Sequence, residues 1–414
     1  MFPTRRDFLK ATMGAPILLS LKSMASNPLV RAASAIVPQR EECDTVLVVL
    51  QLSGGNDGLN TVVPYGDDEY ARNRPTLSLP LKDIHKIDSL IGFHPRMAAF
   101  MRLYEEGHLS IIQGVGYPNM DRSHDGAMRI WHTADPDRPN RQTGWLGRAA
   151  DCIRQPNITT VPAVFVGPIA CPFGLNAEHA IVPSIKSADA LTIKPTYGES
   201  QWRYMAGLPR RDKDNTLLHF LQDRTLQADD FSKRIEAVVQ NPANSAEYPS
   251  FGLAGNLRTI AQLIRADVGI RIFFAELGGG GIGGFDNHAN QLGNHCALLH
   301  QMSESLAAFI DDLKSDKLLD RVLLMTFSEF GRTVRENGRR GTGHGAAAPI
   351  FLAGGRLKQN LVGAHPSLTD LDNGALKFHT DFRSVYATVL DKWLGFESRI
   401  ILDKQYELLD ILSA

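Results

Sequence analysis

The sequence predicts an α/β protein with a mostly parallel sheet flanked by helices on both faces. Three observations predict it. Six short, nearly continuous apolar runs have the length and composition of buried strands. Segments with helical periodicity lie between these runs, and strands that alternate with helices favour a parallel sheet. The chain has 414 residues, of which 43% are hydrophobic and 21% charged, and so it can bury a large core.

The predicted strands are the apolar runs at residues 44–52, 109–115, 161–166, 269–277, 321–327 and 349–353. Helical periodicity is clearest over residues 94–106, 123–132, 214–240, 252–266, 289–314 and 381–394. Ligand sites in such sheets lie beyond the carboxyl ends of the strands. We therefore expect functional residues in the loops that follow the strands.

One α/β domain is predicted over residues 44–396. Within it, residues 168–250 are less regular and rich in Pro, Asp and Lys, and we expect loops followed by a surface helical insert. Residues 397–414 are expected to form a C-terminal tail.

The first 35 residues have the features of an export signal. Residues 4–10 read TRRDFLK, which matches the pattern read by the twin-arginine export machinery. The apolar stretch from Ala11 to Leu21 is too short for a permanent membrane span, and small residues up to Ala35 form a cleavage site. The sequence therefore predicts a signal peptide over residues 1–35 and a periplasmic or extracellular protein that is exported folded. That route suits proteins that acquire a cofactor before they leave the cytoplasm.

Composition excludes several classes of function. The net charge is −1 and no basic stripe favours nucleic-acid binding. No apolar run after residue 35 is long enough to cross a membrane. The cysteines, at positions 43, 152, 171 and 296, fit no zinc motif. An oxidising exterior would permit a disulfide, for which Cys152 and Cys171 are the favoured pair, although the sequence leaves this open.

The first two strands lead into loops with chemically capable residues. Asp57 lies in the glycine-rich loop SGGNDG, where it could bind a metal or cap the next helix. Ser123 stands near a helix start, a place that can activate a nucleophile but that also favours serine as a cap. His124 and Asp125 beside it are either ligands or exposed first-turn residues.

Three later loops add carboxylates and imidazoles. Asp286 and His288 follow a glycine run, and their spacing lets both bind one ion. Glu329 could hold a metal, Arg332 could clamp a phosphate or sulfate oxygen, and the two could instead form a surface ion pair. His344 lies in the glycine-rich loop GTGHG. Carboxylates and imidazoles without cysteine suit a divalent metal such as zinc, manganese, magnesium or calcium.

Several ordered strings resemble a known family, domain of unknown function 1501. They are LSGGNDGLNTVVPY (52–65), RSH (122–124), TGWLGR (143–148), GGFDNHANQ (283–291), SEFGRTVRENGRRGTGHG (328–345) and TDFR (380–383). The resemblance spans about residues 44–396. The family is typically exported by the twin-arginine route and looks like a branch of the alkaline phosphatase and sulfatase superfamily.

The resemblance implies a metal-dependent hydrolase of phosphate or sulfate esters. It implies that Asp57 binds metal and that Ser123 is the nucleophile. The implied metal ligands after these are Asp286, His288 and His344, with Glu329 as a further candidate. Arg332 or Arg122 would steady the oxygens of the transferred group, and the metal would neutralise its charge.

Two positions depart from the family pattern. Gly343 stands where the family usually has an aspartate that the superfamily uses as a ligand, and Asn287 replaces a threonine. Two other readings therefore remain open. The protein could be a non-catalytic exported module that binds a sugar, a cell-wall component or a protein partner in the same cleft, or a structural surface protein. A substrate, if there is one, would be a small-molecule or glycan ester.

Overall fold

A computed structural model describes residues 44–153, 161–186, 231, 233–238, 246–279 and 284–413. In this part of the chain a nine-stranded sheet has the order β11-β5-β10-β9-β1-β8-β6-β7, with β14 beside β5. Its strands are β1 (Val46–Leu52), β5 (Leu109–Gly116), β6 (Ala163–Val166), β7 (Ser184–Ile185), β8 (Ile272–Leu277), β9 (Val322–Phe327), β10 (Ala348–Gly354), β11 (Leu361–Val362) and β14 (Thr380–Asp381). Two small sheets pair β2 (Val62–Val63) and β3 (His85–Lys86) with β4 (Gly92–Phe93), and β12 (Leu371–Asp372) with β13 (Ala375–Leu376).

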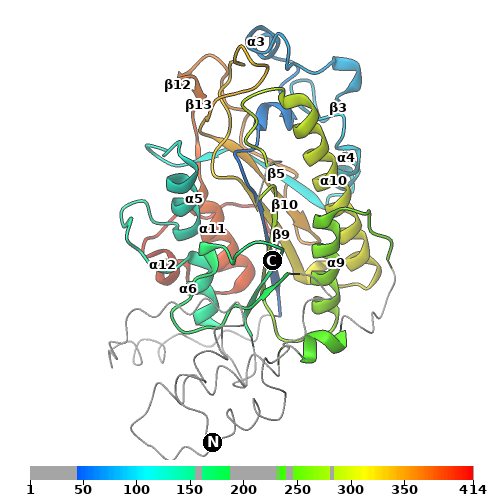
Figure 1. Cartoon of the computed structure of the whole chain (residues 1–414), viewed down its shortest axis with the longest axis vertical. Helices are drawn as coiled ribbons and strands as arrows, with labels where there is room; N and C mark the ends of the chain where they lie inside the picture. Colours follow the sequence, from blue (N-terminus) through cyan, green and yellow to red (C-terminus); the bar gives the residue numbers. More distant parts are fainter. Residues whose placement is uncertain are drawn as a thin grey trace, which may run out of the picture.

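Helices cover both faces of the large sheet (Figure 1). One layer holds α4 (Ala98–Glu105), α9 (Gly252–Arg265) and α10 (Gln291–Ser315), and the other holds α5 (His124–Thr133), α6 (Trp145–Cys152), α11 (Phe382–Thr388) and α12 (Ser398–Leu402). A π-helix, η6 (Val389–Leu394), continues α11. The shorter helices are α3 (Asp68–Asn73), η1 (Gly58–Asn60), η2 (Leu81–Asp83), η3 (Phe173–Leu175) and η5 (Leu319–Arg321).

The central strand β1 is almost wholly apolar because it is buried on both faces of the sheet. Val48 and Leu50 pack into the core under α9 and α10, while Leu47 and Val49 pack into the core on the α5 side. Successive side chains of a strand point to opposite faces, so a strand covered on both sides needs apolar residues at both parities.

Strand β10 is antiparallel to both of its neighbours, β5 and β9. The pairs β1·β8, β1·β9 and β6·β8 are parallel. The amino-terminal end of β10 therefore lies at the same sheet edge as the carboxyl ends of β1, β8 and β9. A loop that precedes β10 can thus join loops that follow the other strands.

The predicted fold class is confirmed, and all six predicted strands are present. Five of the six helical segments are present as well. The helix expected over residues 214–240 falls mostly outside the described residues, as do the signal peptide over residues 1–35 and much of the insert at 168–250. The last residues pack rather than trail away: Ile401, Leu402 and Ile411 belong to the core on the α5 side.

The favoured disulfide does not form in the structure. Cys152 and Cys171 are both free thiols, the first exposed and the second half-buried. Burial raises the pKa of the Cys171 thiol to about 11, which keeps it protonated. None of the helices in the described part of the chain is both long and apolar enough to serve as a transmembrane span.

Candidate metal centre

Side chains from three separate loops meet at the carboxyl edge of the sheet. His124 is the first residue of α5, which follows β5. Asp286 and His288 lie in the loop after β8, and His344 lies in the loop before β10. The antiparallel β10 brings His344 to this edge. His124, Asp286 and His344 each offer a ligand atom, and these atoms lie within 4.8 Å of one another.

His288 completes the group. Its Nε2 lies 2.9 Å from Asp286 Oδ1 and 3.0 Å from His344 Nε2. His344 Nε2 lies 3.2 Å from the same carboxylate oxygen, and His124 Nε2 lies 3.4 Å from Asp286 Oδ2. Three imidazole nitrogens therefore surround one carboxylate. We call His124, Asp286, His288 and His344 the centre.

Two of the imidazoles have their outer nitrogen fixed by an acceptor. His124 Nδ1 donates to Glu329 Oε1 at 2.8 Å, and His344 Nδ1 donates to the backbone oxygen of Arg122 at 2.6 Å. A neutral imidazole with its proton on Nδ1 has a lone pair on Nε2. Both rings therefore direct a lone pair toward the centre, as in metal-binding histidines whose other ring nitrogen donates to a carboxylate or a backbone carbonyl.

The inner nitrogens face the Asp286 carboxylate and one another. Among the described residues, His124 Nε2 is buried without a hydrogen-bond donor or acceptor. His288 Nε2 and His344 Nε2 lie 3.0 Å apart, so both nitrogens are close enough to bind one cation. The donor set of the centre thus fits a divalent metal ion, which it would bind through three nitrogens and a carboxylate.

Glu329 lies behind His124 rather than among the inner atoms. Its side chain is 2% exposed, and Oε1 also accepts the backbone N–H of Gly54 at 2.8 Å. Ser328 Oγ lies 3.2 Å from Oε2. Since both carboxylate oxygens are already bonded, we assign Glu329 the role of orienting His124 in place of the ligand role that the sequence suggested.

Arg332 holds Asp286 and does not face an open site. Its guanidinium is fully buried and donates to Asp286 Oδ1 at 2.7 Å, to Phe285 O at 2.9 Å and to Gly55 O at 2.7 Å. It also donates to Gly54 O. These acceptors occupy the fork that the sequence analysis expected to clamp a phosphate or sulfate. Arg332 instead ties together the loops that follow β1, β8 and β9.

The surroundings also set the charge of the centre. Burial acts to raise the pKa of Asp286, but the hydrogen bond and charge of Arg332 outweigh it and lower that pKa. The hydrogen bond to Glu329 outweighs burial and raises the pKa of His124. Burial lowers the pKa of His288 despite the nearby Asp286. The carboxylate is therefore ionised and ready to bind a cation.

Asp57 departs from its expected role. Both of its oxygens are bonded to Arg74, with Oδ1 at 2.9 Å from Nη2, and the pair is almost wholly buried. Gln291 and the backbone of Leu59 donate to the same carboxylate. Asp57 is not part of the centre, because its charge is neutralised by a buried arginine and its lone pairs are used. It caps η1, which was the alternative from the sequence.

Ser123 is the N-cap of α5. Its Oγ accepts the backbone N–H of Gly126 at 3.3 Å and donates to Asp121 Oδ1 at 2.7 Å. The residue is exposed and lies between Arg122, whose carbonyl orients His344, and His124 of the centre. The Arg122 side chain points elsewhere and binds Asp372 on β12 at 3.1 Å.

Gly343 adjoins His344 and has room for only a small change. A Cβ atom there would lie 3.2 Å from Thr333 Cγ2. The backbone N–H of Gly343 donates to Thr333 Oγ1 at 3.0 Å. The other family departure, Asn287, turns its Oδ1 toward Asn294 of α10 at 2.8 Å.

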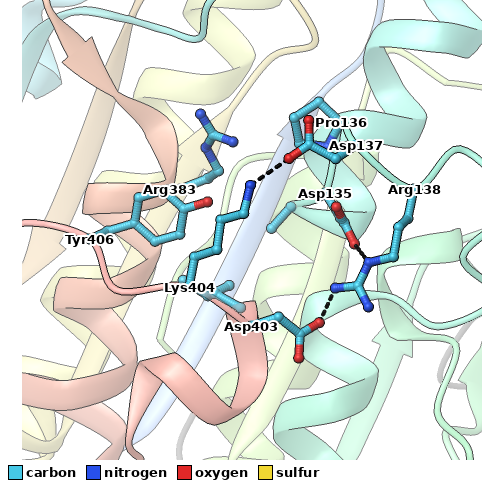
Figure 2. A pocket seen from close by; sticks show the side chains of 10 residues that line it. Asp135, Pro136, Asp137, Arg138, Arg383, Asp403, Lys404 and Tyr406 are labelled. Atoms are coloured by element: carbon cyan, nitrogen blue, oxygen red, sulfur yellow. Dashed lines mark hydrogen bonds and ion pairs between the residues drawn. The ribbon is translucent and has the colours of Figure 1, made fainter.

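A pocket of ≈ 290 Å³ lies away from the centre, at the opposite end of α5 (Figure 2). The ten residues of α5 rise about 15 Å. Charged side chains that line the pocket bind one another: Lys404 pairs with Asp137 at 2.5 Å, and Arg138 pairs with Asp135 at 2.6 Å and with Asp403. These pairs use the charges that would otherwise recognise a ligand.

The sequence analysis left His124 open as either a ligand or an exposed first-turn residue. It did not name Asp121. The only signal for His124 was its place after the helix cap in the RSH string, which also fits an exposed first-turn residue. Its partner Glu329 is 205 positions away in the chain. No spacing rule in the sequence connects them.

Residues 203–401 match the family model described as "Protein of unknown function (DUF1501)". The match therefore covers 199 of the 414 residues, a little less than half of the chain. The matched stretch contains Asp286, His288 and His344, together with Glu329 and Arg332, whereas His124 precedes it. No curated protein matches the chain.

Several solved structures are distantly similar to this chain. The C-terminal periplasmic domain of EcEptC from Escherichia coli, in complex with Zn, is 10% identical with a TM-score of 0.37, over 76% of this chain and 75% of that chain. A protein in the alkaline phosphatase superfamily from Vibrio parahaemolyticus is 11% identical with a TM-score of 0.37, over 92% and 78%. Alkaline phosphatase from the Antarctic bacterium TAB5 is 11% identical with a TM-score of 0.33, over 76% and 92%. These likenesses concern the fold alone.

Proposed function

We propose that the protein is an exported hydrolase of phosphate or sulfate esters that depends on a divalent metal held by the centre. One observation carries the proposal. The inner nitrogens of three histidines surround the Asp286 carboxylate, and the Nδ1 protons of His124 and His344 are directed outward by fixed acceptors. This arrangement of donor atoms supports a cation bound between the side chains.

The donor set narrows the choice of metal. Magnesium and calcium prefer sites built from oxygen atoms. Three imidazoles and one carboxylate suit zinc or manganese better. We therefore expect zinc or manganese from the four metals that the sequence left open. When bound, the ion would neutralise charge on the transferred group.

Ser123 is the nucleophile in this proposal. Its hydroxyl proton points to Asp121, which would accept it, and its place at the start of α5 would stabilise negative charge on the bound group. Ser123 Oγ would bond to phosphorus or sulfur while the ester bond to the leaving oxygen breaks. Water would then release the group from the serine.

A second candidate function is binding without catalysis in the same cleft, for a sugar, a cell-wall component or a protein partner. It is favoured by Gly343, which replaces the aspartate usual in the family, and by the capping bond from Gly126 that engages Ser123 Oγ. A metal-loaded protein that hydrolyses no phosphate or sulfate ester would support this second function.

The experiment compares metal content in three purified proteins. We expect about one zinc or manganese ion per chain in the wild type and in the control His300→Ala, whose half-exposed ring packs on Phe251 outside the centre. His344→Ala should lose the ion. A ligand at 100 times its dissociation constant stabilises a protein by about 2.7 kcal/mol, so chelation should also lower the melting temperature of the wild type and not of His344→Ala.

Metal-free wild type with no response to chelation would contradict the proposal. The same preparation tests export, because the protein should be recovered from the periplasm with an amino terminus that follows Ala35. A protein found in the cytoplasm with Arg5 and Arg6 still attached would contradict that part alone.

A further inference from the structure

A second polar cluster lies beside the centre, on the α5 side of the sheet. His132 Nε2 donates to Gln51 Oε1 at 2.7 Å, and Gln51 Nε2 donates to Ser53 Oγ at 2.7 Å. Ser53 Oγ then donates to Glu276 Oε1 at 2.5 Å. Every proton of this chain points toward Glu276, because the amide and the hydroxyl each accept from one side and donate to the other. We call these four residues the relay.

The relay runs from the interior to the rim of the sheet. His132 and Gln51 are buried, whereas Ser53 and Glu276 are half-buried. Burial lowers the pKa of His132 to about 3, so its ring stays neutral and keeps the proton that it donates. Such aligned hydrogen bonds polarise one another. The buried members thus fix the orientation of the carboxyl group at the rim.

Glu276 is linked to the surroundings of the centre through Ser53, whose neighbour Gly54 donates to Glu329. Strand β8, which carries Glu276, pairs with β1, and β1 pairs with β9, which leads to Glu329. Strands two apart are about 10 Å from each other. Phe274 packs into the core on the α5 side, so Glu276, two positions later on β8, faces that side as well. Glu329 faces it too, through its hydrogen bond to His124 of α5. An ester held at the centre could place its leaving oxygen at Glu276.

We propose that Glu276, positioned by Ser53, is the general acid and base of the hydrolysis. The inference rests on the proposed function. In the described part of the chain the centre is the one group of residues that could hold a metal ion. A proton donor for the leaving group supplies what a second ion could otherwise provide, namely stabilisation of the departing oxygen.

The proton transfers balance over the two half-reactions. As Ser123 Oγ bonds to phosphorus or sulfur, its proton passes to Asp121. The bond to the leaving oxygen breaks, and that oxygen takes the proton of the Glu276 carboxyl group and departs as an alcohol. In the second half, water attacks the serine ester and gives a proton to the Glu276 carboxylate. Ser123 Oγ leaves and regains its proton from Asp121.

The environment suits a carboxyl group that must hold a proton. Burial raises the pKa of Glu276, the charge of Glu329 raises it further, and the hydrogen bond from Ser53 acts in the opposite direction. These are the groups that act on it from β1 and from the loop after β9. A catalytic acid works best with a pKa close to the working pH. The bare backbone at Gly279 leaves space for the carboxyl group, since a Cβ there would overlap it.

The alternative is that Ser53 and Glu276 only anchor the loop after β1. The two roles differ in how they respond to the leaving group. If the two residues only anchor the loop, their loss should lower the rate of hydrolysis of all esters alike. A general acid matters most for a leaving group that is a poor one without a proton, such as an alkoxide, and least for 4-nitrophenolate.

The test compares metal-loaded wild type, Glu276→Gln, Ser53→Ala and the control Glu105→Gln, whose side chain is exposed on α4. Substrates are a 4-nitrophenyl ester and an alkyl ester, as both phosphates and sulfates. We expect Glu276→Gln to lower kcat for the alkyl ester by about 100-fold or more and to affect the 4-nitrophenyl ester far less. Metal content should stay at the wild-type value, and the control should behave like the wild type.

A second readout does not need activity. In protein labelled with carboxyl ¹³C-glutamate, the resonance lost in Glu276→Gln should titrate above the ordinary range for glutamate, and Ser53→Ala should shift it further upward. Equal losses on both esters, no loss, or an ordinary titration would each overturn the role of Glu276 alone. A wild type without metal, or one that is loaded and hydrolyses none of the esters, would overturn the proposed function and this inference with it.

Discussion

Asp57 and Asp286 are two carboxylates in glycine-rich loops at the same edge of the sheet, and they differ in what lies next to them. Asp57 is paired with Arg74 inside the protein, and its pKa is lowered because Arg74 outweighs the effect of burial. Asp286 shares one oxygen with Arg332 and keeps its place among three imidazoles. The sequence shows both as an aspartate after glycines and so gave them the same role.

Replacing Asp57 by asparagine should separate these roles. The change leaves the Arg74 charge buried without a partner, which costs about 3–5 kcal/mol of stability. Metal content should not change, because Asp57 lies outside the centre. Urea unfolding and elemental analysis measure the two effects. The double variant Asp57→Asn, Arg74→Met should regain part of the lost stability, since it removes the unpaired charge as well.

A loss of bound metal in Asp57→Asn at unchanged stability would return Asp57 to the centre as a ligand. The sequence identified Asp286, His288 and His344 as a group that the structure brings together. It did not predict the burial of Arg332, because an exposed clamp and a buried loop anchor are both arginines beside a carboxylate. Only the buried carbonyls of Gly54, Gly55 and Phe285 distinguish the two.

At the scale of elements, helix α5 carries three of the functional positions. Its cap holds Ser123, its first residue is His124, and His132 near its end begins the relay. Gly126 lies within the first turn, and a Cβ there would overlap the Asp121 carboxylate and lie 2.8 Å from Ser123 Oγ. The glycine is thus required by the contact between Asp121 and Ser123 rather than by the helix.

Gly126→Ala should lower the hydrolysis of phosphate or sulfate esters by about 10-fold or more, because it displaces the group that accepts the serine proton. The intrinsic helix preference of alanine over glycine, about 1 kcal/mol, offsets the local strain, so the melting temperature should change little. Gly255→Ala in α9 is the matched control, since no atom of the described chain lies within 4 Å of its added Cβ. Full activity in Gly126→Ala would show that Asp121 is not the proton acceptor.

The strands of the large sheet were predictable and the direction of one of them was not. Continuous apolar composition marks a strand buried on both faces, as β1, β8 and β9 are. The run at 349–353 has the same composition, although β10 is antiparallel. Composition reports burial and not direction. The place of His344 at the functional edge depends on that direction.

At the scale of the whole molecule, three buried histidines should make folding sensitive to acid. Burial lowers the pKa of His94 and His132 to about 3 and that of His295 to about 4. The unfolded chain has the ordinary value of about 6.5, so it binds protons first as the pH falls. Stability from these groups is complete above that value and is lost between it and the folded-state values.

Each such histidine lowers the free energy of unfolding by about 1.4 kcal/mol for each pH unit below the ordinary pKa. The three together lower it by about 4 kcal/mol per pH unit as an upper bound. Unfolding of the chelated protein in urea at pH 7 and pH 5 measures the slope. His94→Asn retains an acceptor for the backbone N–H of Arg96, which His94 Nδ1 accepts at 3.0 Å. It should remove about a third of the slope. An unchanged slope would contradict a neutral buried His94.

The fold class followed from the sequence because alternation of apolar runs and helical periodicity is local information. The centre followed only in part, because its members join segments far apart in the chain. His124 and Glu329 are separated by 205 positions, and His344 and Arg122 by 222. Pairs of this kind are set by strand order and direction, which no local pattern encodes.

The separation of these segments has a consequence for loading. Residues near 124, 288 and 344 meet only after β5, β8, β9 and β10 have assembled. An unfolded chain therefore offers an ion no comparable set of ligand atoms. If the chain crosses the membrane already folded, the centre is complete before export. The ion that the protein carries would then be chosen by the free metal concentrations of the cytoplasm and not by those of the compartment where the protein works.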